Sequence, residues 1–254
     1  MDENMKVYDQ VILHVFERIF RQHAEADYLP FTKADIEQAI AELELGVSTK
    51  NVPDIVYTYR SGRPLLPTAI TRYGRWAIEG EGKGRYAFRK LDRSPYFDIP
   101  NDIAITQIFD ATPGIVLKYQ GADEQALLAR IRYNRLLDIF TSLTTYHLQG
   151  HFRTTVTNTG QIEIDDLYIG VDVNGRGTIL PLEAKIASPK EQLGVFQVTQ
   201  MVKFAQQQFP DLTVRPIGLK LMADGTFMFL EFTPETDPNL IATERYKRYQ
   251  LIRE

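Results

Sequence analysis

The stretch that decides the fold is GQIEIDDLYIGVDVNGRGTILPLEAKI, residues 160–186. Apolar and polar side chains alternate in each of its halves, and a glycine-rich segment separates the halves. Alternation with a period of two is typical of β-strands, and a glycine-rich break between two strands is typical of a hairpin. We therefore expect neighbouring strands at 161–170 and 178–186.

Acidic residues gather on this predicted hairpin. Because side chains alternate between the faces of a strand, Glu163 and Asp165 share one face, and Glu183 and Lys185 share a face of the next strand. A hairpin can bring the two pairs together. Three acids and a lysine are costly to bury in an apolar sheet unless a cation and a polar substrate fill the gap. The pattern thus predicts a site for a divalent metal ion.

Helix and strand signals flank the hairpin. The sequence EQALLARIRYNRLLDIFTSL, which follows Asp123, predicts one long helix that ends near residue 145. Further strands are expected at 152–158, 214–222 and 226–233, and a further helix at 194–208. The order α-β-β-β-α-β-β predicts an α/β fold with a mixed central sheet flanked by helices. The charged tail TERYKRYQLIRE is expected to form a surface helix.

The central residues resemble the PD-(D/E)XK, or restriction-endonuclease-like, nucleases, which place an acid on one strand and E-x-K on the next. Here these are Asp165 and Glu183-Ala184-Lys185. Residues 100–235 also look like uncharacterised microbial proteins described as endonucleases. The resemblance implies that Asp165, Glu183 and the carbonyl of Ala184 hold Mg²⁺ or Mn²⁺. It also implies that Lys185 orients or activates the attacking water and stabilises the phosphorane during hydrolysis of double-stranded DNA.

Several assignments stay open at this point. Asp166 can replace Asp165 as the metal ligand, because no Pro-Asp pair fixes the register. The Gln that this class often carries on the next helix is either Gln200, in a Q-x-x-x-F spacing, or Gln197. A simple salt bridge of Lys185 with one of the acids is the structural alternative to a catalytic site.

The N-terminal sequence favours helices followed by a hairpin. Helical spacing covers residues 5–23, Thr32 can cap a helix that ends before Gly46, and Pro53 suits the first turn of a third helix. The segment RWAIEGEGKGRYAFRKL then reads as two strands joined by the turn 80–84. This order predicts a mainly helical, winged-helix-like domain.

Charge is unevenly divided within that domain. Residues 1–46 carry four Lys or Arg and ten Asp or Glu, whereas residues 47–93 carry ten Lys or Arg and four Asp or Glu. We expect residues 1–93 to bind DNA through the last helix and the hairpin turn. The candidate contacts are Tyr59, Arg60, Arg63, Lys83 and Arg85. The alternative is a small helical domain with a solvated basic face.

The remaining segments complete the predicted organisation. Residues 94–121 contain prolines and little periodicity and are expected to be a linker, followed by a nuclease domain at 122–254. His147 and His151 are interpreted as a helix end, with a substrate role as the alternative. Three arginines on the helix before the sheet are interpreted mainly as a solvated face, with phosphate contact as the alternative: Arg130, Arg132 and Arg135.

Composition narrows the chemistry and the compartment. The 254 residues include no cysteine, which excludes thiolate metal sites and favours hard cations such as Mg²⁺. No signal peptide, membrane span or G-x-x-x-x-G-K-[ST] loop is evident, so we expect a soluble, cytoplasmic protein without its own ATP-driven motor.

The favoured hypothesis is a two-part DNA endonuclease of a type II-like restriction or defence kind. By analogy we expect a homodimer and a separately encoded methyltransferase. Two alternatives are a DNA-binding regulatory protein on an inactive nuclease scaffold and a structure-specific repair or junction nuclease.

Overall fold

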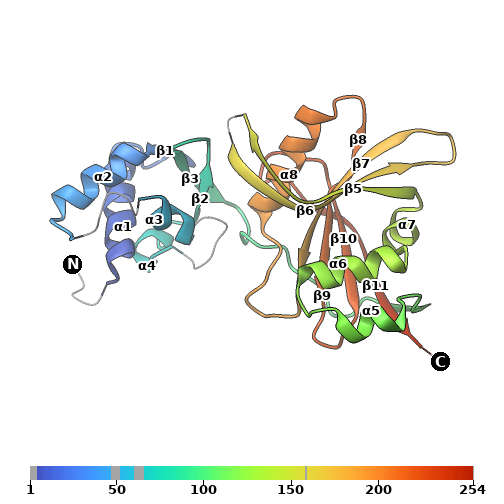
Figure 1. The fold of residues 1–254 in the computed structure, drawn as a ribbon. Helices are drawn as coiled ribbons and strands as arrows, with labels where there is room; N and C mark the ends of the chain where they lie inside the picture. The colour runs from blue at the N-terminus through green and yellow to red at the C-terminus, as the bar shows by residue number, and fades with distance from the viewer. Residues whose placement is uncertain (1–4, 47–51, 60–65, 158, 254) are drawn as a thin grey trace. The chain divides into compact units, whose positions relative to one another are not determined.

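The computed structural model describes residues 5–46, 52–59, 66–157 and 159–253 (Figure 1). The chain forms two compact units. The first comprises Met1–Pro95 with Thr155–Gln161, and the second comprises Tyr96–Thr154 with Ile162–Glu254. Among the described residues, no helix combines the length and apolar character that crossing a membrane requires.

The first unit packs short helices on a small antiparallel sheet. Its elements are α1 (Val7–Phe20), β1 (Tyr28–Thr32), α2 (Lys33–Glu42), α3 (Val52–Tyr59), α4 (Thr68–Thr71), β2 (Arg75–Gly80) and β3 (Arg85–Leu91). The strands lie in the order β1-β3-β2. The three expected helices and the hairpin are present, whereas β1 and α4 were not predicted because they are too short to show a period.

Aromatic packing and a helix cap explain this arrangement. The ring of Phe16 on α1 meets Trp76 and Phe88 edge-on, with centroids 5.3 and 5.1 Å away. At the start of α2, the backbone N–H and the hydroxyl of Thr32 both donate to Asp35, at 2.8 and 2.7 Å. The expected helix start at Thr32 is therefore fixed by local hydrogen bonds.

The second unit is a large mixed sheet covered by helices. Its elements are β4 (Ile105–Phe109), α5 (Gly114–Tyr119), α6 (Glu124–Tyr133), α7 (Leu136–Thr141), β5 (Thr144–Val156), β6 (Gly160–Val171), β7 (Gly177–Lys185), α8 (Val195–Gln208), β8 (Thr213–Val214), β9 (Ile217–Leu221), β10 (Phe227–Phe232) and β11 (Thr243–Ile252). The sheet order is β4-β11-β10-β9-β7-β6-β5, and β8 pairs with β7. This confirms a mixed α/β sheet flanked by helices.

Each face of this sheet has its own cover. Leu180, Leu182 and Ala184 of β7 join the core cluster that α6 and α7 supply. The other face of β7 packs against α8 (Figure 1). Because side chains alternate, Glu183 lies on the α8 side of β7.

Two segments form strands that the sequence did not predict. Residues 94–121, expected as a linker, contain β4, which pairs in parallel with β11. The tail at 243–254, expected as a surface helix, is β11 itself, with Tyr249 buried. Both expectations were wrong: β4 is stabilised by β11, more than a hundred residues away, and β11 is held between β4 and β10.

The expected long helix after Asp123 is also wrong. It breaks into α6 and α7 at Asn134 and Arg135, where Arg135 is left-handed with a φ of 47°. The side-chain oxygen of Asn134 accepts the N–H of Ala111 at 2.7 Å, a contact distant in sequence. Strand β5 then begins at Thr144, so the two histidines that we interpreted as a helix end lie on a strand.

Candidate active site

Asp165 on β6 is buried, with 7% of its surface exposed. One oxygen of its carboxylate accepts the backbone N–H of Ala184 on β7, at 2.7 Å. Burial raises the pKa of Asp165 above its usual value, and the opposing charge of Lys185 does not cancel this effect. The side chain is thus held against the E-x-K segment of β7.

Glu183 and Lys185 form a buried ion pair on β7. The Nζ atom of Lys185 lies 2.5 Å from Oε1 of Glu183, and both residues are 3% exposed. Burial, and then the neighbouring Asp165, raise the pKa of Glu183 to about 8. Burial lowers the pKa of Lys185, but the carboxyl groups of Glu183 and Asp165 outweigh it and leave the pKa above its usual value. Lys185 is therefore a cation at neutral pH.

Two further side chains complete this buried cluster. Gln197, near the start of α8, donates to Oε1 of Glu183 at 2.5 Å. Of the two glutamines left open by the sequence, it is therefore Gln197 that contacts an acid; Gln200 is half-buried and makes no hydrogen bond to either acid. Glu124, in the first turn of α6, lies 3.8 Å from the Nζ atom of Lys185.

Glu124 was not among the site residues predicted from the sequence. A glutamate in the first turn of a helix is ordinarily explained by the helix dipole, so no local signal marked it. The residues that meet at this point come from α6, β6, β7 and α8. Together they form what we call the acid cluster: Asp165, Glu183, Lys185, Gln197 and Glu124.

Glu163 lies outside this buried group. Its side chain is 40% exposed and contacts Nδ1 of His151 at 2.9 Å and the guanidinium of Arg153 at 3.2 Å. Burial raises the pKa of Glu163, but hydrogen bonds from His151 and Arg153 outweigh it and leave the pKa below its usual value. Glu163 therefore faces the edge strand β5, at the border of the acid cluster.

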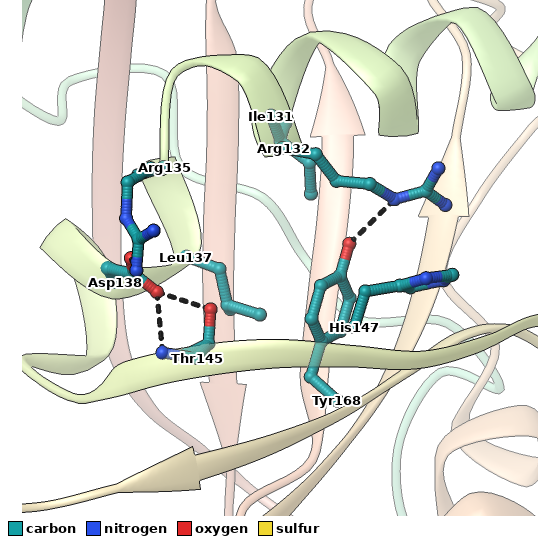
Figure 2. A pocket seen from close by; sticks show the side chains of 8 residues that line it. All are labelled: Ile131, Arg132, Arg135, Leu137, Asp138, Thr145, His147 and Tyr168. Carbon is teal, nitrogen blue, oxygen red and sulfur yellow. Dashed lines mark hydrogen bonds and ion pairs between the residues drawn. The ribbon is translucent and has the colours of Figure 1, made fainter.

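Asp166 belongs to the opposite face of β6. It is fully buried and is bound by Arg132 through both carboxylate oxygens at 2.7 Å, by the hydroxyl of Tyr168 at 2.5 Å and by His147 at 2.9 Å. Arg132, His147 and Tyr168 line a pocket of about 170 Å³ between α6, α7 and β5 (Figure 2). The contacts of Asp166 give it a structural role, and they leave Asp165 as the acid beside Glu183.

The candidate DNA contacts of the first unit fall into three groups. Tyr59 is 3% exposed and its hydroxyl donates to Asp9, so it lies in the core and is not available to DNA. Lys83 and Arg85 are exposed at the turn between β2 and β3. Arg60 and Arg63 lie outside the described residues. The expectation for Tyr59 failed because α3 turns that residue inward.

The acid cluster fits a hard divalent cation by its donor chemistry. Within the described residues, no three His, Asp or Glu side chains already converge as a metal cage. Asp165 and Glu183 nevertheless offer carboxylate oxygens, which Mg²⁺ and Mn²⁺ prefer. Burial raises the pKa of both carboxyl groups, because their charged forms are poorly solvated there. A bound cation favours those charged forms.

No family model matches the chain, and comparisons with curated proteins and with solved structures gave no match. The function is therefore inferred from the chemistry of the acid cluster and the elements that position it.

Proposed function

We propose that this chain is a metal-dependent endonuclease of the PD-(D/E)XK class that hydrolyses phosphodiester bonds in double-stranded DNA. The observation that carries the proposal is the meeting of Asp165, Glu183 and Lys185, with Gln197 bound to Glu183, at one place on a mixed sheet. A simple structural salt bridge between Lys185 and Glu183 does not require a second buried acid, Asp165, beside it.

The strand arrangement supports the same class. Strands β5, β6 and β7 lie side by side, β6 is antiparallel to β7, and α8 connects β7 to β9, which is parallel to β7. The acid lies on β6 and E-x-K lies on β7, in the order that the resemblance implied. A restriction-endonuclease-like fold for the second unit is therefore part of the proposal.

Asp165 and Glu183, with the carbonyl of Ala184, would hold Mg²⁺ or Mn²⁺, which supplies positive charge at the scissile phosphate and a water of lowered pKa. Lys185, kept protonated by its acidic neighbours, donates to a non-bridging phosphate oxygen and stabilises the charge of the phosphorane. Lys185 therefore orients the attacking water and stabilises the phosphorane, and it does not serve as the general base. Gln197 fixes the carboxyl group of Glu183 through its hydrogen bond.

The first unit would position the duplex. Its order α1-β1-α2-α3-α4-β2-β3 and its three-stranded antiparallel sheet agree with a winged helix, in which the β2–β3 turn is the wing. Lys83 and Arg85 on this turn would contact phosphates, which adds affinity without reading sequence. A homodimer that cuts both strands is part of the proposal by analogy.

The test is cleavage of plasmid and short duplex DNA with Mg²⁺, Mn²⁺ or a chelator. The parent should cut only with metal, and Asp165→Asn and Lys185→Met should each lower the rate by at least about 10²-fold, as expected when a group that stabilises the transition state is removed. Asp211→Asn and Lys118→Met, at exposed positions, serve as matched controls. Thermal denaturation verifies that all four variants fold.

Three outcomes separate the proposal from its alternatives. Tight DNA binding without cutting, on substrates of varied sequence and structure, supports a regulatory protein on an inactive scaffold. Cutting restricted to branched or flapped duplexes supports a repair or junction nuclease. Full activity in Lys185→Met contradicts the site.

A further inference from the structure

His151 holds an unusual backbone conformation on the edge strand β5. Its φ is 48°, in the left-handed region that residues with a Cβ atom rarely adopt. Such strain persists where the surroundings fix it, often at functional sites. Here the Nδ1 atom of its ring lies 2.9 Å from Glu163, which leaves Nε2 as the free ring nitrogen among the described contacts.

The sheet order places this ring beside the acid cluster. Glu163 precedes Asp165 by two residues on β6, so the two share a face at a spacing of about 6.6 Å along the strand. His151 and Asp165 interact electrostatically. Because β6 lies between β5 and β7, His151 flanks Asp165 on one side and Lys185 flanks it on the other.

This arrangement suits an in-line displacement at phosphorus, in which the attacking and leaving oxygens lie on opposite sides. Lys185 lies toward one of these sides and His151 toward the other. The charged groups that face His151 are Glu163, Arg153 and Asp165, from β5 and β6. The Nδ1 atom of His151 and the guanidinium of Arg153 contact the same carboxylate oxygen of Glu163.

We propose that His151 is the general acid of the proposed nuclease, and that it gives its Nε2 proton to the oxygen that leaves phosphorus. The inference rests on the proposed function. As the bond from the water oxygen to phosphorus forms, the bond to the leaving oxygen breaks and its electron pair takes the proton from Nε2. The attacking water releases one proton to solvent, and His151 regains one from solvent. Glu163 is a positioning residue that holds the ring through Nδ1.

The experiment compares two DNA substrates. Analysis of the product ends first identifies the bridging oxygen that leaves phosphorus. A second duplex then carries sulfur in place of that one oxygen. Sulfur leaves as a thiolate, which does not need to be protonated. Single-turnover cleavage is measured for the parent and for His151→Gly, a variant that suits the positive φ and so keeps the fold. His23→Gly, at an exposed histidine of the first unit, is the matched control.

We expect His151→Gly to slow cleavage of the oxygen substrate by about 10²-fold or more, within the usual range for general acid catalysis. The sulfur substrate should be cut within about threefold of the parent rate, on the same principle. Glu163→Gln should lower the rate on the oxygen substrate by a smaller factor and leave that on the sulfur substrate unchanged.

Each remaining result counts against the inference. If His151→Gly loses the same factor in cleavage rate on both substrates, or loses none on either, His151 does not protonate the leaving group. The nuclease proposal is unaffected by that result. A parent that cuts neither substrate with any divalent metal overturns the nuclease proposal and this inference together.

Discussion

Asp165 and Asp166 follow one another on β6 and act on opposite faces of the sheet. Asp165 accepts the N–H of Ala184 beside the E-x-K segment, whereas Asp166 is enclosed by Arg132, Tyr168 and His147 under α6. One acid is thus free to serve chemistry and the next one stabilises the fold.

Exchanging these two acids for asparagine should have opposite consequences. Asp166→Asn removes the partner of a half-buried arginine, and we expect a loss of about 3–5 kcal/mol in the free energy of unfolding. Asp165→Asn should leave the free energy of unfolding unchanged or raise it, because a buried acid with a raised pKa becomes neutral. Urea denaturation in chelator measures both. Equal destabilisation by the two variants would contradict the division of roles.

The raised pKa of Glu183 predicts a pH dependence of stability. Folded Glu183 titrates near 8, against 4.5 for the free group, so the folded protein binds more protons between these values. The contribution of Glu183 to the free energy of unfolding is complete below pH 4.5 and is lost as pH rises through 8. The free energy of unfolding then falls by at most about 1.4 kcal/mol per pH unit. In chelator, the parent should lose stability from pH 6 to 9, and Glu183→Gln should lose less. Glu244→Gln, at an exposed acid, should follow the parent.

Glu124 is expected to support the proposed reaction through Lys185. Because its carboxylate lies 3.8 Å from the Nζ atom, Glu124→Gln should lower kcat by roughly 10-fold, with KM nearly unchanged, as for a group that acts only in the transition state. Steady-state cleavage kinetics with Mg²⁺ provide the measurement, with Glu244→Gln as the control. A rise in KM alone would assign Glu124 to DNA binding instead.

The β2–β3 turn is expected to contact DNA phosphates. Replacing Lys83 and Arg85 by alanine should weaken binding to all duplexes alike and reduce the slope of log Kd against log salt by about 2, one for each phosphate contact. Fluorescence anisotropy in chelator, at several salt concentrations, tests this. The double variant Lys6→Ala/Arg21→Ala removes two exposed cations from the α1 side and should leave the slope unchanged.

Tyr59 should affect the stability of the first unit and not its affinity for DNA. Its buried hydroxyl donates to Asp9, so Tyr59→Phe is expected to cost about 1–2 kcal/mol of unfolding free energy. DNA affinity of the folded variant should match that of the parent. A weaker complex without a change in stability would restore Tyr59 as a DNA contact.

For the fold, the confirmed predictions are ones that rest on short sequence patterns. The alternating residues of 160–186 form β6 and β7, the helical spacing near the N-terminus forms α1, and Thr32 caps α2. A strand period or a helix cap involves residues within a few positions of one another, so the sequence contains the whole signal. The shared face of Glu183 and Lys185 follows from the same alternation.

The failures have a common cause in contacts between distant segments. Strand β4 pairs with β11, which lies more than a hundred residues further along the chain, and β11 is held between β4 and β10. The break between α6 and α7 depends on the contact of Asn134 with Ala111. Glu124 reaches Lys185 and His151 reaches Glu163 from other elements, and no spacing in the sequence marks either contact.

The sequence by itself determined the strands that carry the acids, the E-x-K spacing and the chemistry these residue types favour. Only the tertiary structure decided that Asp165 rather than Asp166 lies beside Glu183, that Gln197 rather than Gln200 binds it, and that Tyr59 is buried. Strand pairing register and helix rotation set those outcomes. Both depend on packing against residues far along the chain, which a local pattern does not record.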